Sequence, residues 1–278
     1  MCIPGSYFHC FNEGKWGGLD GVCGVEFDKD DGIVKGVKGG WRERFEGFKN
    51  RLESREPLQY ILGSWDFRTL NDITCRRPTL VPRPETEELC GWAIDFMNET
   101  GGEVICRKVL DVGTGTGCIG ISMACEVQGV KVSGVEKDDN AKVLTEENVE
   151  AFKEQFGEGS SYEGVWYGGI EEYEEGGYDV IVSNPPYIPK RDMEGLEENV
   201  KGWEDHGALE GGEDGMDVIR EILKYATERG GVKKGGVVFI EGDEGHPSMV
   251  EREAEGKGWK VEKRMDVRGI ERFVKITI

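Results

Sequence analysis

The sequence Asn184-Pro185-Pro186-Tyr187 contains the residue types best suited to chemistry, and it follows the apolar run 180–183. Proline has a fixed φ and no N–H group, so this segment is stiff and its carbonyls have no competing donors beside them. The Asn184 side-chain oxygen and the Pro185 carbonyl can each accept one hydrogen from a planar amide or an aromatic amine, with Tyr187 packed on its face. The segment therefore predicts a site for an NH₂ group, although Asn-Pro after a strand is also an ordinary turn signal.

A second chemical signal is the glycine-rich run 113–117, which follows the short apolar segment 108–112 and precedes a predicted helix that ends near Val127. Glycines take positive φ and let the backbone approach a ligand, and a helix N-terminus offers free N–H groups. The run therefore indicates a phosphate or nucleoside site. Glu136 ends the next predicted strand, about twenty residues later, where a carboxylate suits two ribose hydroxyls.

The glycine run alone leaves the cofactor open, because residues 115–120 also fit the G-x-G-x-x-G fingerprint of dinucleotide-binding proteins such as NAD-dependent dehydrogenases. Asp111 disfavours that alternative. Its carboxylate, two residues before Gly113, lies close to where a pyrophosphate has to bind. It can instead pair with the cationic amino-acid end of S-adenosylmethionine.

The elements that must position these residues alternate along the chain. Strands are predicted at 108–112, 130–135, 162–169, 178–183 and 237–240, with an antiparallel pair at 259–266 and 272–278. Helices are predicted at 41–54, 85–97, 118–127, 138–156, 216–228 and 247–255, the second of them stopped by the glycines at 101 and 102. This order predicts an α/β fold with seven strands. The glycine run and the Asn-Pro-Pro-Tyr segment then meet at the carboxyl ends of neighbouring strands, where open sheets bind ligands.

The chain is predicted to divide into three parts. Residues 1–40 are glycine-rich and expected to be weakly ordered, 41–84 form a helix and a hairpin connector, and 85–278 form the predicted α/β domain that contains both signals. The apolar face of helix 41–54 is expected to dock on the next segment. Extended pieces at 58–63, 65–70 and 73–81, with a turn at Asn71-Asp72, predict the hairpin. Residues 188–214 are polar and glycine-rich, which is typical of a lid or substrate loop.

Composition limits the partners. The net charge of -20 and a pI near 4.7 disfavour stable nucleic-acid binding and fit a neutral or basic partner, although acidity also simply confers solubility. The eight cysteines form no Cys-x-x-Cys pair and only three histidines accompany them, so no metal site is expected. No apolar run approaches the roughly twenty residues of a membrane span. We expect a cytoplasmic protein, with a mitochondrial or plastid location as the alternative.

The chain closely resembles the HemK/PrmC family of protein glutamine methyltransferases from about Trp41 to Ile278. The segments that carry the resemblance are 57–63, 80–87, 111–117, 183–188 and 208–215. Pro-Arg-Pro-Glu-Thr-Glu at 82–87 separates this family from other proteins with an Asn-Pro-Pro-Tyr segment. Departures are the missing N-terminal helical bundle, Glu204-Asp205 in place of Glu-Pro, and Gly168-Gly169 where an adenine contact is expected, with Trp166 or Tyr167 as possible substitutes.

The resemblance implies a seven-stranded, Rossmann-like class I methyltransferase that uses S-adenosyl-L-methionine. The implied substrate is the glutamine of the Gly-Gly-Gln loop in a class 1 peptide-chain release factor, and the chain is expected to act as a monomer. The alternatives are a DNA or RNA amino-methyltransferase and a non-catalytic cofactor-binding protein. By resemblance, Asn184 contacts cofactor and target amide, and Pro185, Pro186 and Tyr187 complete the glutamine pocket. The implied cofactor contacts, besides Asp111 and Asn184, are Gly113, Thr114, Gly115, Thr116, Gly117 and Glu136.

Overall fold

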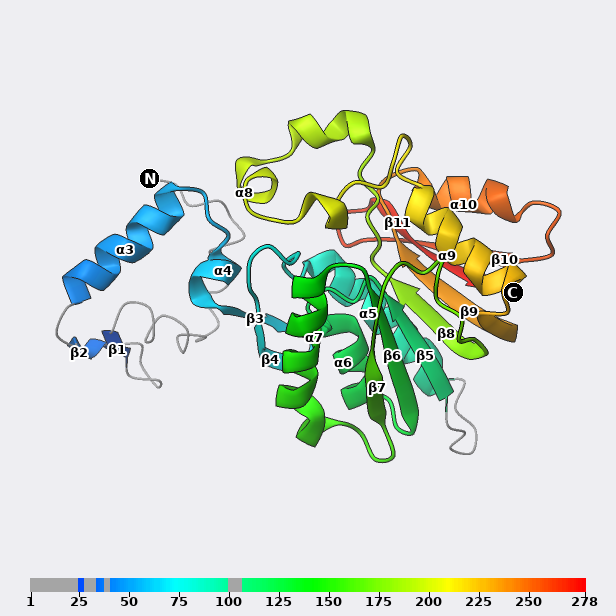
Figure 1. Cartoon of the computed structure of the whole chain (residues 1–278), viewed down its shortest axis with the longest axis horizontal. Helices are drawn as coiled ribbons and strands as arrows, with labels where there is room; N and C mark the ends of the chain where they lie inside the picture. Colours follow the sequence, from blue (N-terminus) through cyan, green and yellow to red (C-terminus); the bar gives the residue numbers. More distant parts are fainter. Residues whose placement is uncertain (1–24, 28–33, 38–40, 100–106) are drawn as a thin grey trace.

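The computed structural model of the chain describes residues 25–27, 34–37, 41–99 and 107–278. A seven-stranded sheet in the order β10-β11-β9-β8-β5-β6-β7 forms its centre (Figure 1). The strands are β5 (Arg107–Val112), β6 (Val130–Glu136), β7 (Ser161–Tyr167), β8 (Tyr178–Ser183), β9 (Val232–Glu241), β10 (Lys260–Met265) and β11 (Glu271–Thr277). β11 is antiparallel to both of its neighbours, and the other pairs are parallel. The predicted α/β fold with seven strands is confirmed.

Helices cover both faces of the sheet, so its central strands are apolar on both sides, as parallel sheets require. Val109 and Leu110, neighbours on β5, are both fully buried and lie in the two separate hydrophobic clusters. One face is covered by α5 (Pro84–Glu99), α6 (Cys118–Glu126) and α7 (Asp139–Phe152), which η1 (Lys153–Gln155) extends, and the other by α9 (Asp217–Glu228) and α10 (His246–Ala254).

The chain reverses its direction of travel across the sheet at β5. It runs from β5 through β6 to β7 on one side and then returns to β8, which pairs with β5 on the other side. The loops that follow β5 and β8 therefore diverge at their carboxyl ends, and a crevice opens between them. The glycine run follows β5 and the Asn-Pro-Pro-Tyr segment follows β8, as predicted.

Before α5, the described residues form only short helices and strands. These are β1 (Val25–Phe27), β2 (Val34–Val37), α3 (Trp41–Glu53), α4 (Leu58–Leu62), β3 (Ser64–Phe67) and β4 (Leu70–Thr74). Most of the predicted weakly ordered segment 1–40 lies outside the described residues, as do the glycines at 101 and 102; within 1–40, β1 and β2 pair antiparallel. The predicted division at residue 85 stays a prediction, and the apolar side chains of the β3-β4 hairpin pack in the same cluster as α5 and α6.

The prediction of an extended segment at 58–63 is wrong, because Leu58–Leu62 forms a short helix with Tyr60 and Ile61 buried. Pro57 lies at its N-cap, and Gly63 ends it in the left-handed region at φ 82° and donates its N–H to the Gln59 carbonyl. Proline at the start of a helix and glycine just after its end are recognised helix boundaries. These two residues were the sequence signal for a helix.

The hairpin itself forms, but its turn lies at Arg68-Thr69 and not at Asn71-Asp72. Arg68 takes a positive φ of 52°, which is uncommon for a residue with a side chain. Its guanidinium donates two hydrogen bonds, of 3.0 and 2.8 Å, to the Glu126 carboxylate at the end of α6. A contact 58 residues away thus supports the turn, and no local pattern could indicate it.

The predicted docking of the α3 apolar face is not seen for two of its residues, because Phe45 and Leu52 remain exposed. The segment after β8 is folded rather than open, with short turns of helix at η2 (Lys190–Gly195), α8 (Glu198–Lys201) and η3 (His206–Ala208). Among the described residues, no helix combines the length and apolar character needed to cross a bilayer.

Candidate functional site

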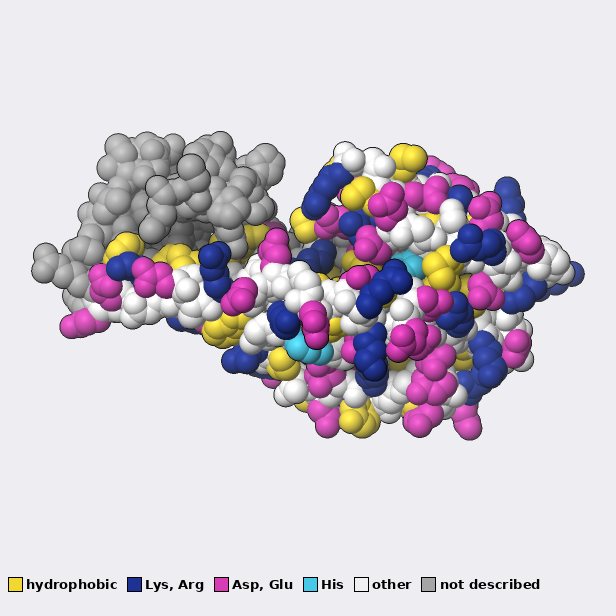
Figure 2. Space-filling view, turned by 90° about the horizontal axis from the view of Figure 1, so that it is seen from above, with side chains coloured by type: hydrophobic (Ala, Val, Ile, Leu, Met, Phe, Trp, Pro, Cys, Tyr) yellow, Lys and Arg dark blue, Asp and Glu magenta, His cyan; other side chains and the backbone are white. Residues whose placement is uncertain are grey.

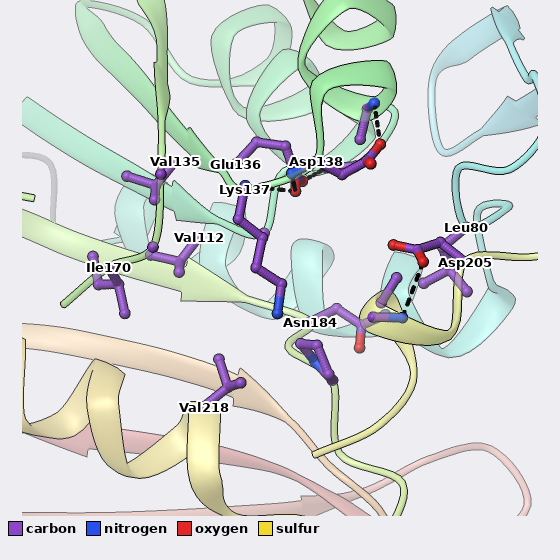
Figure 3. Close-up of a pocket in the computed structure, with 18 of the residues that line it drawn as sticks. Leu80, Val112, Val135, Glu136, Lys137, Asp138, Ile170, Asn184, Asp205 and Val218 are labelled. Carbon is purple, nitrogen blue, oxygen red and sulfur yellow. Dashed lines mark hydrogen bonds between the residues drawn. The ribbon is translucent and has the colours of Figure 1, made fainter. Parts of the chain in front are cut away.

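A cavity with about 860 Å³ of empty space, its open mouth included, lies where the carboxyl ends of β5, β6 and β8 meet (Figure 3). Five of the residues predicted to bind cofactor or substrate line it, namely Gly113, Gly115, Glu136, Asn184 and Pro186. The glycine run and the Asn-Pro-Pro-Tyr segment, which are far apart in the sequence, therefore border one cavity.

The glycine turn exposes backbone to this cavity. Gly115 has φ 60°, and a Cβ built on it meets no atom closer than 3.9 Å, so this glycine is needed for its backbone conformation. Gly117 is needed for packing as well, because a Cβ there approaches the Thr145 side chain to 2.9 Å. Thr114 and Thr116 are buried and do not line the cavity. Thr114 Oγ1 instead donates to the buried Asp111 carboxylate at 2.9 Å.

Asp111 is fully buried beneath the turn and does not line the cavity. Its Oδ2 atom accepts hydrogen bonds from Thr114 Oγ1 at 2.9 Å and from the Gly120 N–H at 3.1 Å. Burial raises the pKa of this carboxyl to about 7, against the effect of those two bonds. Its Oδ1 atom has no hydrogen-bond partner among the described residues, so one acceptor remains for a cationic group. Direct pairing with a cofactor stays a prediction.

Glu136 forms the opposite wall of the cavity at the end of β6. Its Oε1 atom accepts the N–H groups of Lys137 and Asp138 at 2.9 and 3.0 Å, and its Oε2 atom accepts the Gly115 N–H at 2.9 Å. The carboxylate therefore joins the strand end to the glycine turn. Since Oε2 carries one of these three bonds, it has the free acceptor capacity for a hydroxyl group.

Asn184 lines the cavity from the end of β8, and its amide nitrogen is held from behind. Nδ2 donates to Thr86 Oγ1 at 2.9 Å, and Thr86 Oγ1 donates to Glu241 Oε2 at 2.8 Å. The side-chain oxygen of Asn184 is therefore the atom left to accept a hydrogen from a ligand. Thr86 was predicted only as a member of the segment 82–87, and no role was predicted for Glu241.

The remaining predicted residues lie behind the cavity wall. Pro185 is buried, and Tyr187 is partly buried with its hydroxyl 3.4 Å from Glu241 Oε1 and its ring 6.3 Å from that of His246. Residues 209–212 run beside this segment, and the Gly211 N–H donates to the Ile188 carbonyl at 2.9 Å. Neither Pro185 nor Tyr187 lines the cavity, so their contact with a substrate stays a prediction.

The charge of the lining was not predicted from the sequence. Among the described residues, the carboxylates of the lining belong to Glu136, Asp138, Glu171, Asp205 and Glu221. The one basic side chain in this set is that of Lys137, which points into the cavity (Figure 3). Burial and the neighbouring Glu171 raise the pKa of Glu221. A site with this lining favours a cation over an anion.

The predicted substitutes for an adenine contact do not line the cavity. Trp166 packs on Tyr173 with ring centroids 5.4 Å apart, and Tyr167 is exposed. The residues after β7 that do line it are Gly168 to Glu171, with Ile170 buried. The turn after β7, rather than β7 itself, therefore forms this part of the cavity wall.

A buried ion pair joins the Pro-Arg-Pro-Glu-Thr-Glu segment to the loop after β8. Arg83 Nη2 lies 2.8 Å from both carboxylate oxygens of Glu204. The Glu204 side chain is 1% exposed and that of Arg83 is 31% exposed. Burial raises the pKa of Glu204, and Arg83 opposes this rise. The pair thus fixes the loop that carries Asp205 and Ala208 to the cavity.

Arg83→Met is expected to lower the free energy of unfolding by on the order of 3 kcal/mol, because it leaves the Glu204 carboxylate buried without its partner. Arg76→Met is the matched control, since its ion pair with Glu147 is about half exposed on both sides. Arg76→Met is expected to lower the free energy of unfolding by less than about 1 kcal/mol. Urea unfolding of both variants measures the difference, and equal losses would contradict a structural role for the Arg83 pair.

Comparison with known proteins agrees with this site. Residues 95–199 match the family described as "Methyltransferase small domain". The human MTRF1L release factor glutamine methyltransferase is 36% identical over 212 residues, which cover 72% of this chain and 60% of that protein. The release factor glutamine methyltransferase of Gloeobacter violaceus is 32% identical over 231 residues, which cover 82% of this chain and 76% of that protein.

The chain thus spans about three-fifths of the length of the human relative. Among solved structures, the hMettl16 catalytic domain, crystallised with MAT2A 3'UTR hairpin 1, matches with a TM-score of 0.59. That match covers 98% of this chain and 91% of that domain at 14% identity, so it shows the methyltransferase fold alone. The 32% identity to the Gloeobacter protein, over most of both chains, establishes that this chain belongs to the family of release factor glutamine methyltransferases.

Proposed function

We propose that this chain transfers a methyl group from S-adenosyl-L-methionine to the side-chain nitrogen of the glutamine in the Gly-Gly-Gln loop of a class 1 peptide-chain release factor. The observation that carries this proposal is the orientation of Asn184, whose nitrogen is bound to Thr86 and whose oxygen is left for a ligand. An acceptor oxygen beside a glycine turn suits an incoming NH₂ group. Family membership supports glutamine as the carrier of that group.

The lining of the cavity supports the proposed cofactor. S-adenosylmethionine carries a sulfonium and an ammonium against one carboxylate, so it is a net cation, whereas the pyrophosphate of a dinucleotide is an anion. Five carboxylates against one lysine favour the former. The residues that would hold it are Glu136, at its ribose, and Asp111, whose unpaired Oδ1 suits its ammonium group.

The proposed catalysis depends on positioning. When bound, the cofactor would supply an electrophilic methyl group on its sulfonium. As the new N–C bond forms, the S–C bond breaks, S-adenosylhomocysteine leaves, and the amide nitrogen gives up one proton to water. An amide nitrogen is a weak nucleophile because its lone pair is delocalised into the carbonyl. Acceptance of both N–H hydrogens, by Asn184 Oδ1 and the Pro185 carbonyl, would orient this nitrogen and stabilise the tetrahedral form in which its lone pair is free. Positioning of this kind can contribute about 7–11 kcal/mol.

The proposed partner is the release factor alone. A chain with a net charge of -20 favours a basic or neutral protein surface over a nucleic acid. We propose a monomer that acts in the cytoplasm, with a mitochondrion or plastid as the alternative compartment. These assignments follow from composition and family membership.

The experiment that tests the function compares substrates. The purified protein is incubated with methyl-labelled S-adenosylmethionine and, in separate reactions, a class 1 release factor, double-stranded DNA or total RNA. Label in the release factor alone is expected. Label in a nucleic acid would replace the proposal with an amino-methyltransferase. Cofactor binding with no transfer to any of the three would indicate a non-catalytic protein.

A further inference from the structure

The hydrogen-bond chain behind Asn184 joins three elements far apart in the sequence. Asn184 follows β8, Thr86 lies in the first turn of α5, and Glu241 ends β9. Thr86 is 3% exposed and Glu241 is 1% exposed, so solvent does not compete for these groups. The Tyr187 hydroxyl lies 3.4 Å from the second oxygen of Glu241. The two carboxylate oxygens of Glu241 therefore contact residues that lie directly behind the cavity wall.

The hydrogen bonds from Asn184 through Thr86 to Glu241 can run in only one direction as long as Glu241 is ionised. A carboxylate can only accept, so the single hydroxyl hydrogen of Thr86 is committed to it. Thr86 Oγ1 then offers only lone pairs to Asn184, and the amide has to face it with its nitrogen. The Asn184 oxygen is thereby left for the substrate.

We propose that Thr86 and Glu241 are positioning residues of the methyl transfer, which set the Asn184 amide in the one orientation that accepts a hydrogen from the substrate. The proposal rests on the proposed amide methylation. Neither residue lines the cavity, so neither touches substrate or cofactor. Their effect is on turnover through Asn184, and cofactor affinity is left unchanged.

Protonation of Glu241 removes this constraint. A protonated carboxyl can donate to Thr86, whose hydroxyl is then free to donate to the Asn184 oxygen. The amide nitrogen would turn toward the substrate, which already brings two N–H donors. Turnover is therefore expected to be low when Glu241 is protonated and to rise as the pH passes upward through its pKa.

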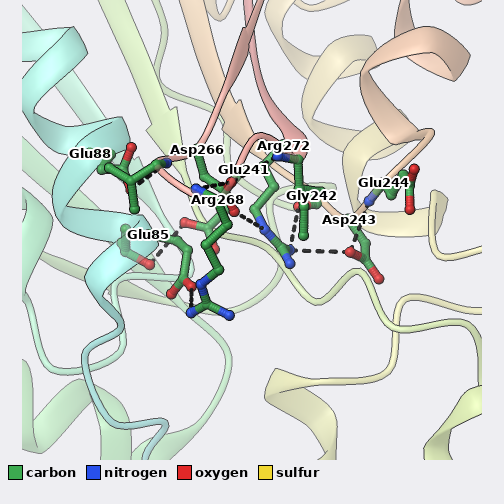
Figure 4. Close-up of polar contacts among 12 residues, drawn as sticks. Glu85, Glu88, Glu241, Gly242, Asp243, Glu244, Asp266, Arg268 and Arg272 are labelled. Atoms are coloured by element: carbon green, nitrogen blue, oxygen red, sulfur yellow. Dashed lines mark hydrogen bonds and ion pairs between the residues drawn. The ribbon is translucent and has the colours of Figure 1, made fainter. Parts of the chain in front are cut away.

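The surroundings of Glu241 place this transition near neutral pH. Burial raises the pKa of its carboxyl to about 7. Hydrogen bonds from Thr86 and Tyr187 and the charge of Arg272 on β11 oppose this rise, whereas Glu85 on α5 adds to it. Figure 4 shows Glu241 in the cluster with these two charged residues. Glu85 is itself paired with Arg268, and Arg272 with Asp266 at 3.0 Å.

The test uses three variants and one control. Thr86→Val keeps the shape but removes the hydroxyl, Thr86→Ser restores the hydroxyl, and Glu241→Gln removes the ionisation. Thr227→Val is the matched control, because its hydroxyl donates to the Leu223 carbonyl within α9. Turnover of the release factor is measured from about pH 5.5 to 8.5. The cofactor is kept at saturating concentration, because the pKa of Asp111 is also raised to about 7 and its protonation would otherwise lower turnover through cofactor affinity. Cofactor affinity is measured by calorimetry.

Thr86→Val is expected to lower kcat between about tenfold and a hundredfold, with cofactor affinity within about threefold of wild type. Thr86→Ser and Thr227→Val are expected to stay close to wild type. The wild type should lose activity as the pH falls through 7, and Glu241→Gln should lose this acid limb. Thr86→Val with normal kcat, a Thr86→Ser as slow as Thr86→Val, or an acid limb that persists in Glu241→Gln would each overturn the positioning role.

These results are separate from a failure of the function itself. A wild-type protein that methylates no amide overturns the proposed function, and the role of Thr86 and Glu241 with it. A wild type that methylates the release factor, with variants that behave like it at every pH, overturns the positioning role alone.

Discussion

Asn184→Ala is expected to keep the affinity for S-adenosylmethionine within about tenfold and to lower turnover by on the order of a hundredfold to a thousandfold. In the proposed complex, the glycine turn and Glu136 contact the cofactor, and the change at Asn184 leaves both in place. The substrate amide loses the oxygen that orients it. Single-turnover kinetics with a release factor and calorimetry with the cofactor measure the two effects separately.

Asn71→Ala is a suitable control, because Asn71 is an exposed residue of β4 outside the cavity. Its turnover should equal that of wild type. Near-normal turnover of Asn184→Ala would contradict the proposed role of the Asn-Pro-Pro-Tyr segment. A large loss of cofactor affinity in that variant would instead assign Asn184 to cofactor binding.

Glu136→Ala is expected to have the opposite effect, with cofactor affinity lowered by about a hundredfold and turnover at saturating cofactor largely kept. The carboxylate accepts three backbone N–H groups, from Gly115, Lys137 and Asp138, and is the proposed partner of the ribose. Its removal releases the glycine turn as well as the ligand. Calorimetry measures the affinity.

Glu163→Ala is the control for this variant, since Glu163 is an exposed residue of β7. It should bind the cofactor as wild type does. Equal affinities of Glu136→Ala and wild type would rule out Glu136 as a cofactor residue. Together, Glu136→Ala and Asn184→Ala distinguish cofactor binding at one wall of the cavity from methyl transfer at the other.

Local patterns predicted the parts of the fold that depend on burial. The apolar run before Asn184 and the run before the glycine turn became β8 and β5, side by side as expected. Asp138, the first residue of the predicted helix 138–156, caps α7 and accepts the Ala141 N–H at 2.8 Å. Two neighbouring parallel strands bring their carboxyl ends together, so the position of the site followed from the order of elements.

Contacts between distant residues could not be predicted in this way. Thr86 and Glu241 bond across 155 positions, and Arg68 bonds to Glu126 across 58. The spacing predicted Asp111 as a cofactor contact, but it could not predict that this residue is buried under the turn. Spacing along a strand gives the face on which a side chain lies and does not give the depth of the cavity beside it. The direction of Lys137 into the cavity was missed for the same reason.

In the proposed reaction, the methyl group is transferred to the side-chain nitrogen of one glutamine. A release factor and its Gln→Ala variant in the Gly-Gly-Gln loop are each incubated with the protein and labelled S-adenosylmethionine, and the labelled peptide is located by tandem mass spectrometry. One methyl group is expected on the glutamine side chain of the normal factor and none on the variant. Equal labelling of both factors, or a methyl group on another residue, would contradict the proposed reaction.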